Sequence, residues 1–420
     1  MKLTLRPNPF RQDKPITEFD QFAGRAEELI TLIKALYQTG NGNPRHMIVT
    51  GPRGIGKSSF INQIESVVEE SEKVLSILNI DAGEFDFAFA VFKYRALEGQ
   101  SLHQIISSLL QKIPTKISKE NVKDILGGFL KKWKPSISVA GGAFGVEYHS
   151  DSVSDMSADF VSAVRNLWNA IKNEVHGIIF IIDEVDTVAG DTNIASFLKV
   201  TTEELTESGF NNVAVFLVGI TGAMEKLKED HKSVARIFET VELLPLDEAE
   251  SKDVIDKALS TTDVEVTSGA KDTIVRLSGG FPSPIHQLGY HAFDIDKDNL
   301  IDEDDLEKAL DEVIGRIKRE ELSRLLSEAG SGDSRRITIA MANRDQVNVP
   351  LRDIGEAIGR KTNELSSYMT KLVSTDLINK VDRALYKIND PLLKLYIRKL
   401  DVLDPDLPYE DLESDDDGQN

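Results

Sequence analysis

The sequence predicts an α/β fold, in which a parallel β-sheet with helices on both faces is followed by a helical region and a small basic C-terminal domain. Short continuous apolar runs, typical of strands buried on both faces, alternate with helical patterns in the first 245 residues. The pattern of residues 247–326 is mainly helical. Residues 331–400 hold 13 basic and 8 acidic residues, in a chain whose net charge is −21.

The composition excludes several classes of protein. With 40% hydrophobic and 28% charged residues, the chain is typical of a globular protein. The longest apolar run, at 213–220, is far shorter than the ~20 residues that span a bilayer, and the N-terminus lacks a signal-peptide core. The absence of cysteine excludes disulfides and thiolate sites. We therefore expect a cytoplasmic protein without a membrane partner, whose chemistry uses phosphate or oxygen ligands.

The first elements are predicted in chain order. A proline-rich arm precedes a helix that follows Asp20 and ends at Gly40 to Pro44, where glycine and proline make continuation costly. Apolar runs then predict five strands, at 46–50, 74–80, 178–182, 213–220 and 241–244. Strands that alternate with helices favour parallel connections.

A long segment separates the second and third predicted strands. Helical patterns at 100–112 and 120–133 are followed by an alternating pattern around Gly141-Gly142, which predicts a hairpin, and a helix at 156–174 leads back to the sheet. A linker is expected at 330–334. The expected organisation is a first domain over 1–245 with an insertion at about 82–156, a helical lid over 246–328, a basic domain over 335–400, and a solvated acidic tail over 401–420.

The strongest motif is G-x-x-x-x-G-K-S at residues 51–58, between the first predicted strand and a helix from Ser58. Its glycines let backbone N–H groups surround phosphate oxygens at the positive end of the helix dipole. Lys57 would reach the β and γ phosphates of ATP, and the Ser58 hydroxyl would bind Mg²⁺. The alternative, a glycine-rich turn with a chance lysine, does not explain the flanking strand and helix. The candidate nucleotide-binding residues here are Gly51, Pro52, Arg53, Gly54, Ile55, Gly56, Lys57, Ser58 and Ser59.

A second motif is the apolar strand that begins at Gly177 and ends in Asp183 and Glu184. Asp183 is placed to anchor Mg²⁺, and Glu184 to orient and deprotonate the attacking water. Taken alone, the motif could be a capped strand end. The phosphate-binding loop upstream favours the catalytic interpretation.

Together these motifs resemble the AAA+ and STAND (signal transduction ATPases with numerous domains) branch of the P-loop NTPases, in which an extra strand separates the two motifs. The likeness is strongest to the origin-recognition and archaeal-ATPase-like clade and covers most of residues 7–400. Residues 22–29 resemble the N-terminal signature of that clade, which implies that Phe22 and Arg25 help to frame the adenine. The alternative for this segment is a capped amphipathic helix.

Three further sites are implied by the resemblance. Thr221 is the only polar residue at the position of the family's γ-phosphate sensor, where initiator-like members often carry asparagine. Arg236 resembles the arginine finger, acting in cis or from a neighbouring subunit; otherwise it is a surface arginine. Pro282 resembles the lid's glycine–proline motif and would lie against the base or ribose; otherwise it marks a helix stop and restart.

Two metal-like patterns are weaker. Residues 294–305 nearly match a calcium loop, but Asn299 stands where glycine is needed and Asp305 where a longer glutamate binds, so a helix connection capped by Asp302 is preferred. The histidines form no HExxH pair, and we expect packing or surface roles for them.

The basic region is typical of a winged helix. A short helix at 349–358 and a turn at 359–361 precede a second helix, capped by Thr362 and extending through Val373, and then strands with a wing over 376–388. Leu365, Met369 and Leu372 should face inward. Residues left to contact DNA or a partner protein are Asn363, Ser366, Ser367, Thr370 and Lys371 on the helix, with Arg383 and Lys387 on the wing.

The function predicted from these motifs is an ATPase switch. It would bind ATP or ADP with Mg²⁺, hydrolyse ATP slowly, and use the nucleotide state to reposition the lid and the winged helix on DNA or on a partner protein. A STAND-type signalling or defence ATPase without DNA binding, and an initiator or loader on origin or mobile-element DNA, remain alternatives. A nucleotide-dependent homo-oligomer is compatible with each.

Overall fold

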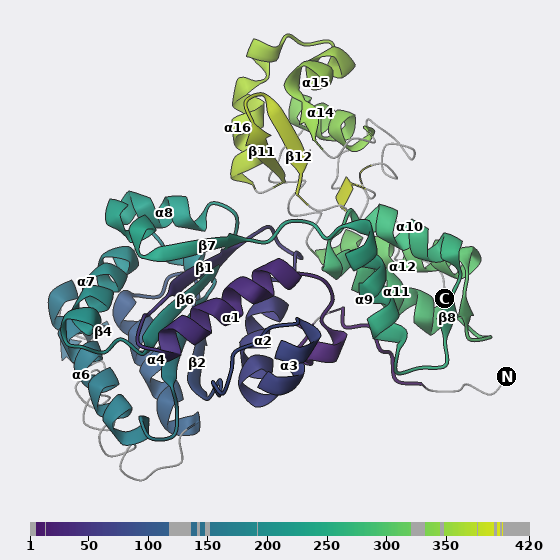
Figure 1. Cartoon of the computed structure of the whole chain (residues 1–420). Coiled ribbons are helices and arrows are strands. Elements are labelled where there is room, and N and C mark those ends of the chain that lie inside the picture. Colours follow the sequence, from purple (N-terminus) through teal and green to yellow (C-terminus); the bar gives the residue numbers. More distant parts are fainter. Residues whose placement is uncertain are drawn as a thin grey trace.

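The computed structural model describes residues 6–12, 14–116, 136–140, 143–147, 152–190, 192–320, 332–344, 348–375, 377–389, 393–394 and 397. Its centre is a five-stranded sheet in the order β2-β5-β6-β1-β7, in which all neighbouring strands are parallel (Figure 1). The extra strand β6 lies between β5 and β1, as the resemblance implies. The strands are β1 (His46–Thr50), β2 (Phe89–Arg95), β5 (Gly177–Asp183), β6 (Val213–Gly219) and β7 (Phe238–Glu242).

The prediction of a strand at 74–80 was wrong. This segment enters the helix α3 (Ser71–Ile77), and Ile77 is 59% exposed, so the run is not buried on both faces. The missing strand is β2, an edge strand that carries Lys93 and Arg95. The charged residues in its second half interrupt the apolar run, so the sequence pattern does not predict this strand. The first part of the expected insertion is therefore a strand of the central sheet, and β7 begins earlier than the predicted 241–244.

Helices cover both faces of the sheet, as predicted. One face packs under α1 (Ala26–Gly40) and α2 (Lys57–Glu69), around Phe60 and Phe216. The other packs under α4 (Leu102–Lys116), α6 (Val153–Ile171), α7 (Ile194–Glu207) and α8 (Ala223–Asp230). The first helix begins later than expected, because Asp20 lies in the 3-10 turn η1 (Phe19–Gln21) and the left-handed Gly24 and Arg25 precede α1.

The predicted hairpin is present. Strands β3 (Ser136–Ala140) and β4 (Ala143–Glu147) are antiparallel, with Val139 opposite Phe144. The helix expected at 120–133 lies outside the described residues. The returning helix α6 starts in a capping box between Ser152 and Asp155. Within the described part of the chain, no helix is long and apolar enough to cross a membrane.

Four helices follow the sheet. They are α9 (Glu248–Leu259), α10 (Ser268–Ser278), α11 (Pro282–Ile295) and α12 (Glu303–Glu320), and they enclose their own apolar core, with a short parallel pair formed by β8 (Glu265–Val266) and β9 (Leu300–Ile301). The Asp302 carboxylate accepts the backbone N–H groups of Asp304 and Asp305, both at 3.0 Å, at the start of α12. This is the capped helix connection that was preferred over a calcium loop.

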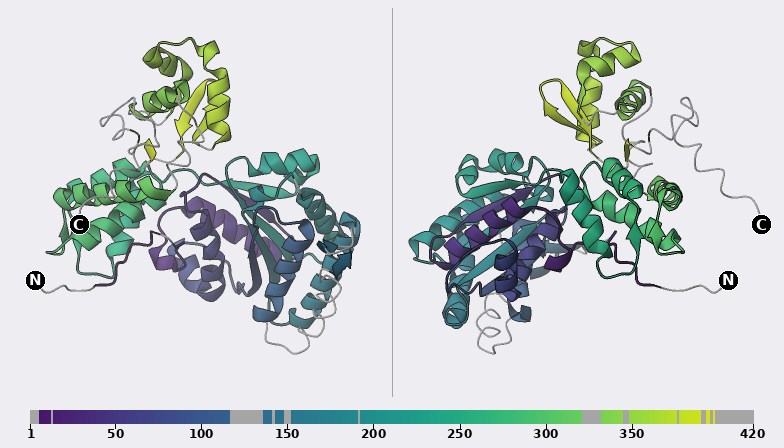
Figure 2. Two further views of the ribbon diagram at one scale, coloured as in Figure 1. Left: turned by 180° about the vertical axis from the view of Figure 1, so that it is seen from behind. Right: turned by 45° about the vertical axis from the view of Figure 1, so that its right-hand side comes forward.

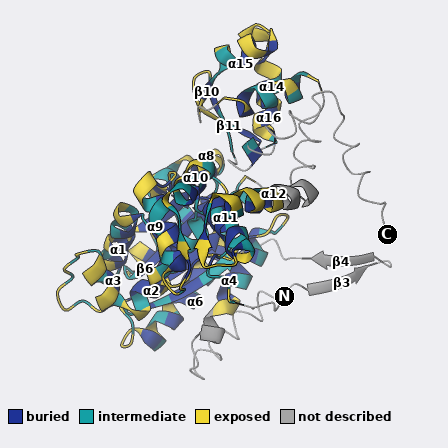
Figure 3. Cartoon of the chain, turned by 90° about the vertical axis from the view of Figure 1, so that its right-hand side faces the viewer, coloured by how far each residue is buried: buried dark blue, intermediate teal, exposed yellow. Residues whose placement is uncertain are grey.

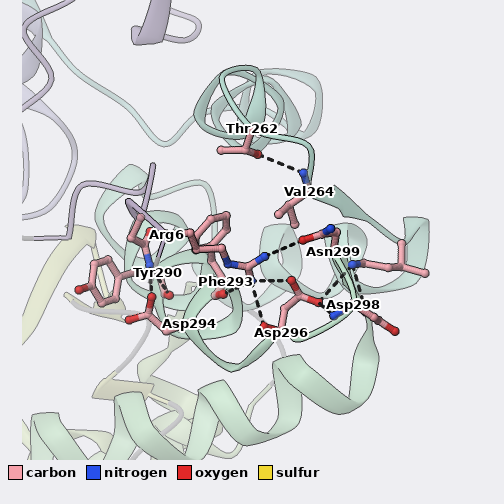
Figure 4. A network of polar contacts seen from close by, with 11 residues as sticks. Arg6, Thr262, Val264, Tyr290, Phe293, Asp294, Asp296, Asp298 and Asn299 are labelled. Atoms are coloured by element: carbon pink, nitrogen blue, oxygen red, sulfur yellow. Dashed lines mark hydrogen bonds and ion pairs between the residues drawn. The ribbon is translucent and has the colours of Figure 1, made fainter. Parts of the chain in front are cut away.

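An N-terminal strap, defined as residues 6–12 and 14–18, lies along these helices. The Arg6 guanidinium pairs with the Asp296 carboxylate at 2.5 Å, lies 4.1 Å from the centre of the Phe293 ring and donates to Asn299 Oδ1 (Figure 4). The Asp296 side chain is fully buried. An arginine thus neutralises the calcium-like loop, and the described residues contain no cluster of three acids or histidines that could hold a metal.

The other end of the strap is attached to the sheet domain. Phe10 is buried on α11, where a side chain on Gly289 would collide with its ring. Further along the strap, two serines of α2 hold the backbone. The Ile16 N–H donates to Ser59 Oγ, and Ser66 Oγ donates to the Thr17 carbonyl. The strap therefore connects α11 with the helix that follows the phosphate-binding loop.

The C-terminal unit combines α14 (Asp333–Ala342), α15 (Leu351–Ile358) and α16 (Ser366–Ser374) with an antiparallel sheet in the order β10-β12-β11. These strands are β10 (Val349–Pro350), β11 (Ile378–Asp382) and β12 (Leu385–Ile388). Figures 2 and 3 show the unit above the lid helices, and Leu310 of α12 packs against the apolar cores of both. The prediction that Thr362 caps the second helix was wrong: residues 362–364 form a 3-10 turn, because Leu365 turns into the core before α16 begins.

Candidate functional site

The phosphate-binding loop joins β1 to α2, as its sequence predicted. Gly54 and Gly56 have φ values of 73° and 97°, a left-handed conformation that favours glycine. A Cβ atom on Gly51 would lie 2.9 Å from the Leu243 carbonyl oxygen, so no other side chain fits there. The N–H groups in the first turn of α2 have no carbonyl acceptor within the helix, and they form the positive end of its dipole. The loop is therefore built to surround an anion.

Lys57 projects over this loop. Its ammonium donates to the carbonyl oxygens of Gly51 and Pro52, at 2.8 and 2.9 Å. Burial lowers the pKa of Lys57, while the carboxylates of Asp186 and Asp183 act in the opposite direction. Ser58 is half-buried in the first turn of α2. Lys57 and Ser58 thus lie at the loop, whereas the hydroxyl of Ser59 holds the strap.

The two predicted acids lie at the carboxyl end of β5. Asp183 is 6% exposed, and its Oδ1 accepts the N–H of Glu184 at 3.0 Å. Glu184 has a φ of 56°, an uncommon left-handed conformation for a residue with a side chain, which turns the chain out of the strand. Asp186 fixes the neighbouring strand end by accepting the N–H of Ile220 at 2.8 Å.

Two cations at this site were missed by the sequence reasoning. Arg95, opposite Asp183 in the sheet, forms an ion pair with the Glu184 carboxylate. Lys93 Nζ lies 3.7 Å from Asp183 Oδ2 and 3.1 Å from Asn62 Oδ1. Burial lowers the pKa of Lys93, against the opposing effect of Asp183. The only sequence signal was Lys-x-Arg after alternating Phe89 and Val91, which places all four residues on one face of a strand.

The residues of the N-terminal signature bind the protein itself. Arg25 is 5% exposed, and its guanidinium donates to the carbonyl oxygens of Leu244 and Ile55, at 2.6 and 3.0 Å. The Arg25 N–H donates to Glu250 of α9 at 2.8 Å. Burial lowers the pKa of Arg25. Phe22 is buried beside Phe60, with ring centres 6.5 Å apart. Arg25 therefore links the phosphate-binding loop to the segment after β7 and to α9.

The start of α11 lies against the same loop. The Ser283 N–H donates to the Gly54 carbonyl at 3.2 Å, and Pro282 Cγ lies 3.7 Å from where a Cβ atom on Gly56 would be. Thr221 is exposed in the turn after β6. Arg236 is exposed at the end of the 3-10 helix η3 (Lys232–Arg236), and its side chain makes no hydrogen bond or ion pair with the described residues. Pro282 thus contacts the loop, whereas Thr221 and Arg236 remain open to solvent.

Comparison with known proteins agrees with this geometry. Residues 21–215, which include the phosphate-binding loop and both acids, match the family model of the AAA ATPase domain. The chain is thus similar to AAA ATPases over residues 21–215. The resemblance to AAA+ proteins and the prediction of their P-loop α/β fold are confirmed, and the match supports nucleotide binding and ATPase activity by residues 21–215. The matched residues end within β6, so the lid and the C-terminal unit follow the AAA ATPase match.

Two solved structures share the fold over almost their whole length. The Walker-type ATPase PABY2304 of Pyrococcus abyssi is 17% identical, with a TM-score of 0.59, and the alignment covers 92% of this chain and 99% of that one. The Aeropyrum pernix ORC2 protein, solved as ADPNP–ADP complexes, is 15% identical, with a TM-score of 0.54 and coverage of 94% and 98%. No curated protein matches the chain.

Proposed function

We propose that the chain is a slow ATPase switch in which the nucleotide bound at the phosphate loop sets the position of the lid, and the lid sets that of a C-terminal winged helix on duplex DNA. The observation that carries this proposal is the contact of α11 with the loop, through Ser283 and Pro282. A ligand that enters the loop must touch or displace the start of α11. Since α12 packs on the C-terminal unit through Leu310, a movement of the lid reaches that unit.

The residues of the loop fit ATP and Mg²⁺. Lys57 would contact the β and γ phosphates, and the oxygen donors of Ser58 and Asp183 suit Mg²⁺, which binds few protein ligands and completes its shell with phosphate and water. When bound, the ion neutralises charge on the phosphates. The ORC2 protein, which was solved with ADPNP and ADP, supports an adenine nucleotide as the ligand. Phe22 and Arg25 would support the adenine side of the site from behind the loop.

Three features support slow hydrolysis. The proposed general base Glu184 forms an ion pair with Arg95. This ion pair must break before the Glu184 carboxylate can accept a proton from water. Thr221, the proposed sensor, is exposed. Arg236, the proposed finger, extends into solvent, where it is free to reach the γ-phosphate of a neighbouring subunit. This arrangement favours activity that rises when a homo-oligomer or a partner supplies the missing contacts.

The C-terminal unit has the element order of a winged helix: helix, strand, helix, helix and two strands. Leu365, Met369 and Leu372 are buried, as predicted, so the opposite face of α16 is available to a partner. Arg383 lies at the tip of the β11–β12 hairpin. The exposed candidates for DNA contact on the helix and its preceding turn are Asn363, Ser366, Ser367, Thr370 and Lys371. Lys387 is half-buried on β12.

Nucleotide and DNA binding are tested separately. Lys57→Ala should abolish tight ATP binding in calorimetry, because it removes the lysine cation from the loop; wild-type affinity would exclude the phosphate assignment. Duplex binding, measured by fluorescence anisotropy in ATP and in ADP, should differ between the two nucleotides and weaken with salt. Each lost phosphate contact lowers the slope of log affinity against log salt by about 0.9.

The DNA test has a matched control. Replacing Lys371, Arg383 and Lys387 with alanine should flatten the salt slope by roughly 3. The same loss of charge on the AAA domain, by changing Lys34, Lys172 and Lys199 to alanine, should leave the slope unchanged. Removing residues 401–420, which carry nine acids and no base, should raise DNA affinity. If no variant binds mixed-sequence duplex even at low salt, a protein partner of the STAND type becomes the better proposal.

A further inference from the structure

The cation Lys93 stands next to the proposed metal site without belonging to any motif. It lies on the edge strand β2, on the same face as the buried Phe89 and Val91, and is paired with Ile181, two positions before Asp183 of β5. Its ammonium is 3.7 Å from Asp183 Oδ2. The other oxygen of that carboxylate accepts the Glu184 N–H. Both oxygens of the proposed metal anchor are thus in contact with positively polarised groups of the protein.

The position of Lys93 is fixed from α2. Its Nζ donates to Asn62 Oδ1 at 3.1 Å, and the Asn62 amide in turn donates to the Ile16 carbonyl of the strap at 3.4 Å. Asn62 follows Ser58 by four residues, so both side chains leave the same face of the helix one turn apart. The ammonium is therefore held between Asn62, one turn after Ser58 on α2, and Asp183 at the end of β5.

We propose that Lys93 is a positioning residue that neutralises the Asp183 carboxylate and so prevents Mg²⁺ from binding there until the phosphates of a nucleotide are present. A divalent ion that approaches Asp183 alone meets a fixed positive charge. The phosphates of ATP supply the negative charge that offsets Lys93, so the ion binds as part of the nucleotide complex. This inference rests on the proposed role of Asp183 as metal anchor.

The test measures metal binding without nucleotide or turnover. Mn²⁺, used as the probe, is titrated into the nucleotide-free protein and followed by electron paramagnetic resonance. A unit charge within several ångströms of a divalent ion changes its affinity by about tenfold or more. Lys93→Met should therefore bind Mn²⁺ at least about tenfold more tightly than the wild type. Lys93→Gln, which keeps a hydrogen-bond donor without the charge, is the second test variant in case Lys93→Met does not fold. It should show the same gain in Mn²⁺ affinity.

Two controls separate charge from structure. Lys93→Arg keeps the charge, and Lys199→Met removes one from a helix on the opposite face of the sheet; both should bind Mn²⁺ as weakly as the wild type. Adding Asp183→Asn to Lys93→Met should abolish the gain. Unchanged Mn²⁺ affinity in both Lys93→Met and Lys93→Gln would overturn the proposal. Calorimetry of ATP binding by the same variants reports on the phosphate loop itself, so failure of the metal inference is distinguishable from failure of the proposed function.

Discussion

Arg25→Ala should destabilise the protein in the absence of nucleotide. The guanidinium donates to two buried carbonyl groups, of Ile55 and Leu244, and is itself 5% exposed. Hydrogen bonds to charged groups contribute about 1.5–3 kcal/mol each, so the pair is worth about 3–6 kcal/mol. Burial of the cation, which lowers the pKa of Arg25, offsets part of this. We therefore expect a loss of about 3 kcal/mol in the free energy of unfolding.

The assay is urea unfolding of the nucleotide-free protein, followed by circular dichroism. Arg25→Lys should recover less than half of the loss, because an ammonium cannot reproduce the fork that reaches both carbonyls. Arg45→Ala removes an exposed arginine that precedes β1 and should leave the midpoint unchanged. Nucleotide affinity of Arg25→Ala should also fall, since Ile55 belongs to the phosphate-binding loop.

The result separates two roles for the same residue. If Arg25 served only to frame the adenine, its loss would weaken ATP binding and leave the nucleotide-free protein as stable as the wild type. An unfolding midpoint for Arg25→Ala equal to that of Arg45→Ala would therefore refute a structural role for the Arg25 guanidinium.

Further expectations follow from other parts of the molecule. Glu184→Gln should retain ATP binding and lower the hydrolysis rate by roughly 10²–10⁴-fold, since the amide cannot accept the proton. A wild-type rate in a phosphate-release assay would show that Glu184 is not the general base. Arg236→Ala should lower turnover with ATP affinity within a few-fold, and mixing it with the Glu184 variant should restore some activity if the finger acts between subunits. Arg6→Ala should cost about 3 kcal/mol in urea unfolding, because it leaves a buried carboxylate unpaired on the lid; an unchanged midpoint would contradict the strap's role. Burial lowers the pKa of His46 and His286 to about 4, so the unfolded state takes up their protons first as the pH falls, and the free energy of unfolding should drop by about 2 kcal/mol between pH 6.5 and 5.5. A flat profile over that range would show that these histidines are not buried in neutral form.

The sequence by itself determined the elements whose signal is local. The phosphate loop was predicted because glycine is needed where the backbone is left-handed, and the flanking strand and helix follow from continuous and periodic apolar patterns. Asp183 and Glu184 were also predicted from a local signal, because they directly follow a continuous apolar run that is typical of a buried strand. The inward face of α16, with Met369 and Leu372, followed from helical spacing alone.

The tertiary structure alone decided which groups meet at that site. Lys93 and Arg95 lie almost ninety residues before the acids that they contact, and only the pairing of β2 with β5 brings them together. Their charges made β2 unlike a buried strand, because an edge strand needs apolar residues only where it is covered. Arg25 was assigned to the nucleotide from a motif, whereas its hydrogen bonds depend on a fold that places Leu244 and Ile55 around it. A hydrogen bond between distant residues is a property of the packed chain, since no local pattern records which carbonyl groups a guanidinium will reach.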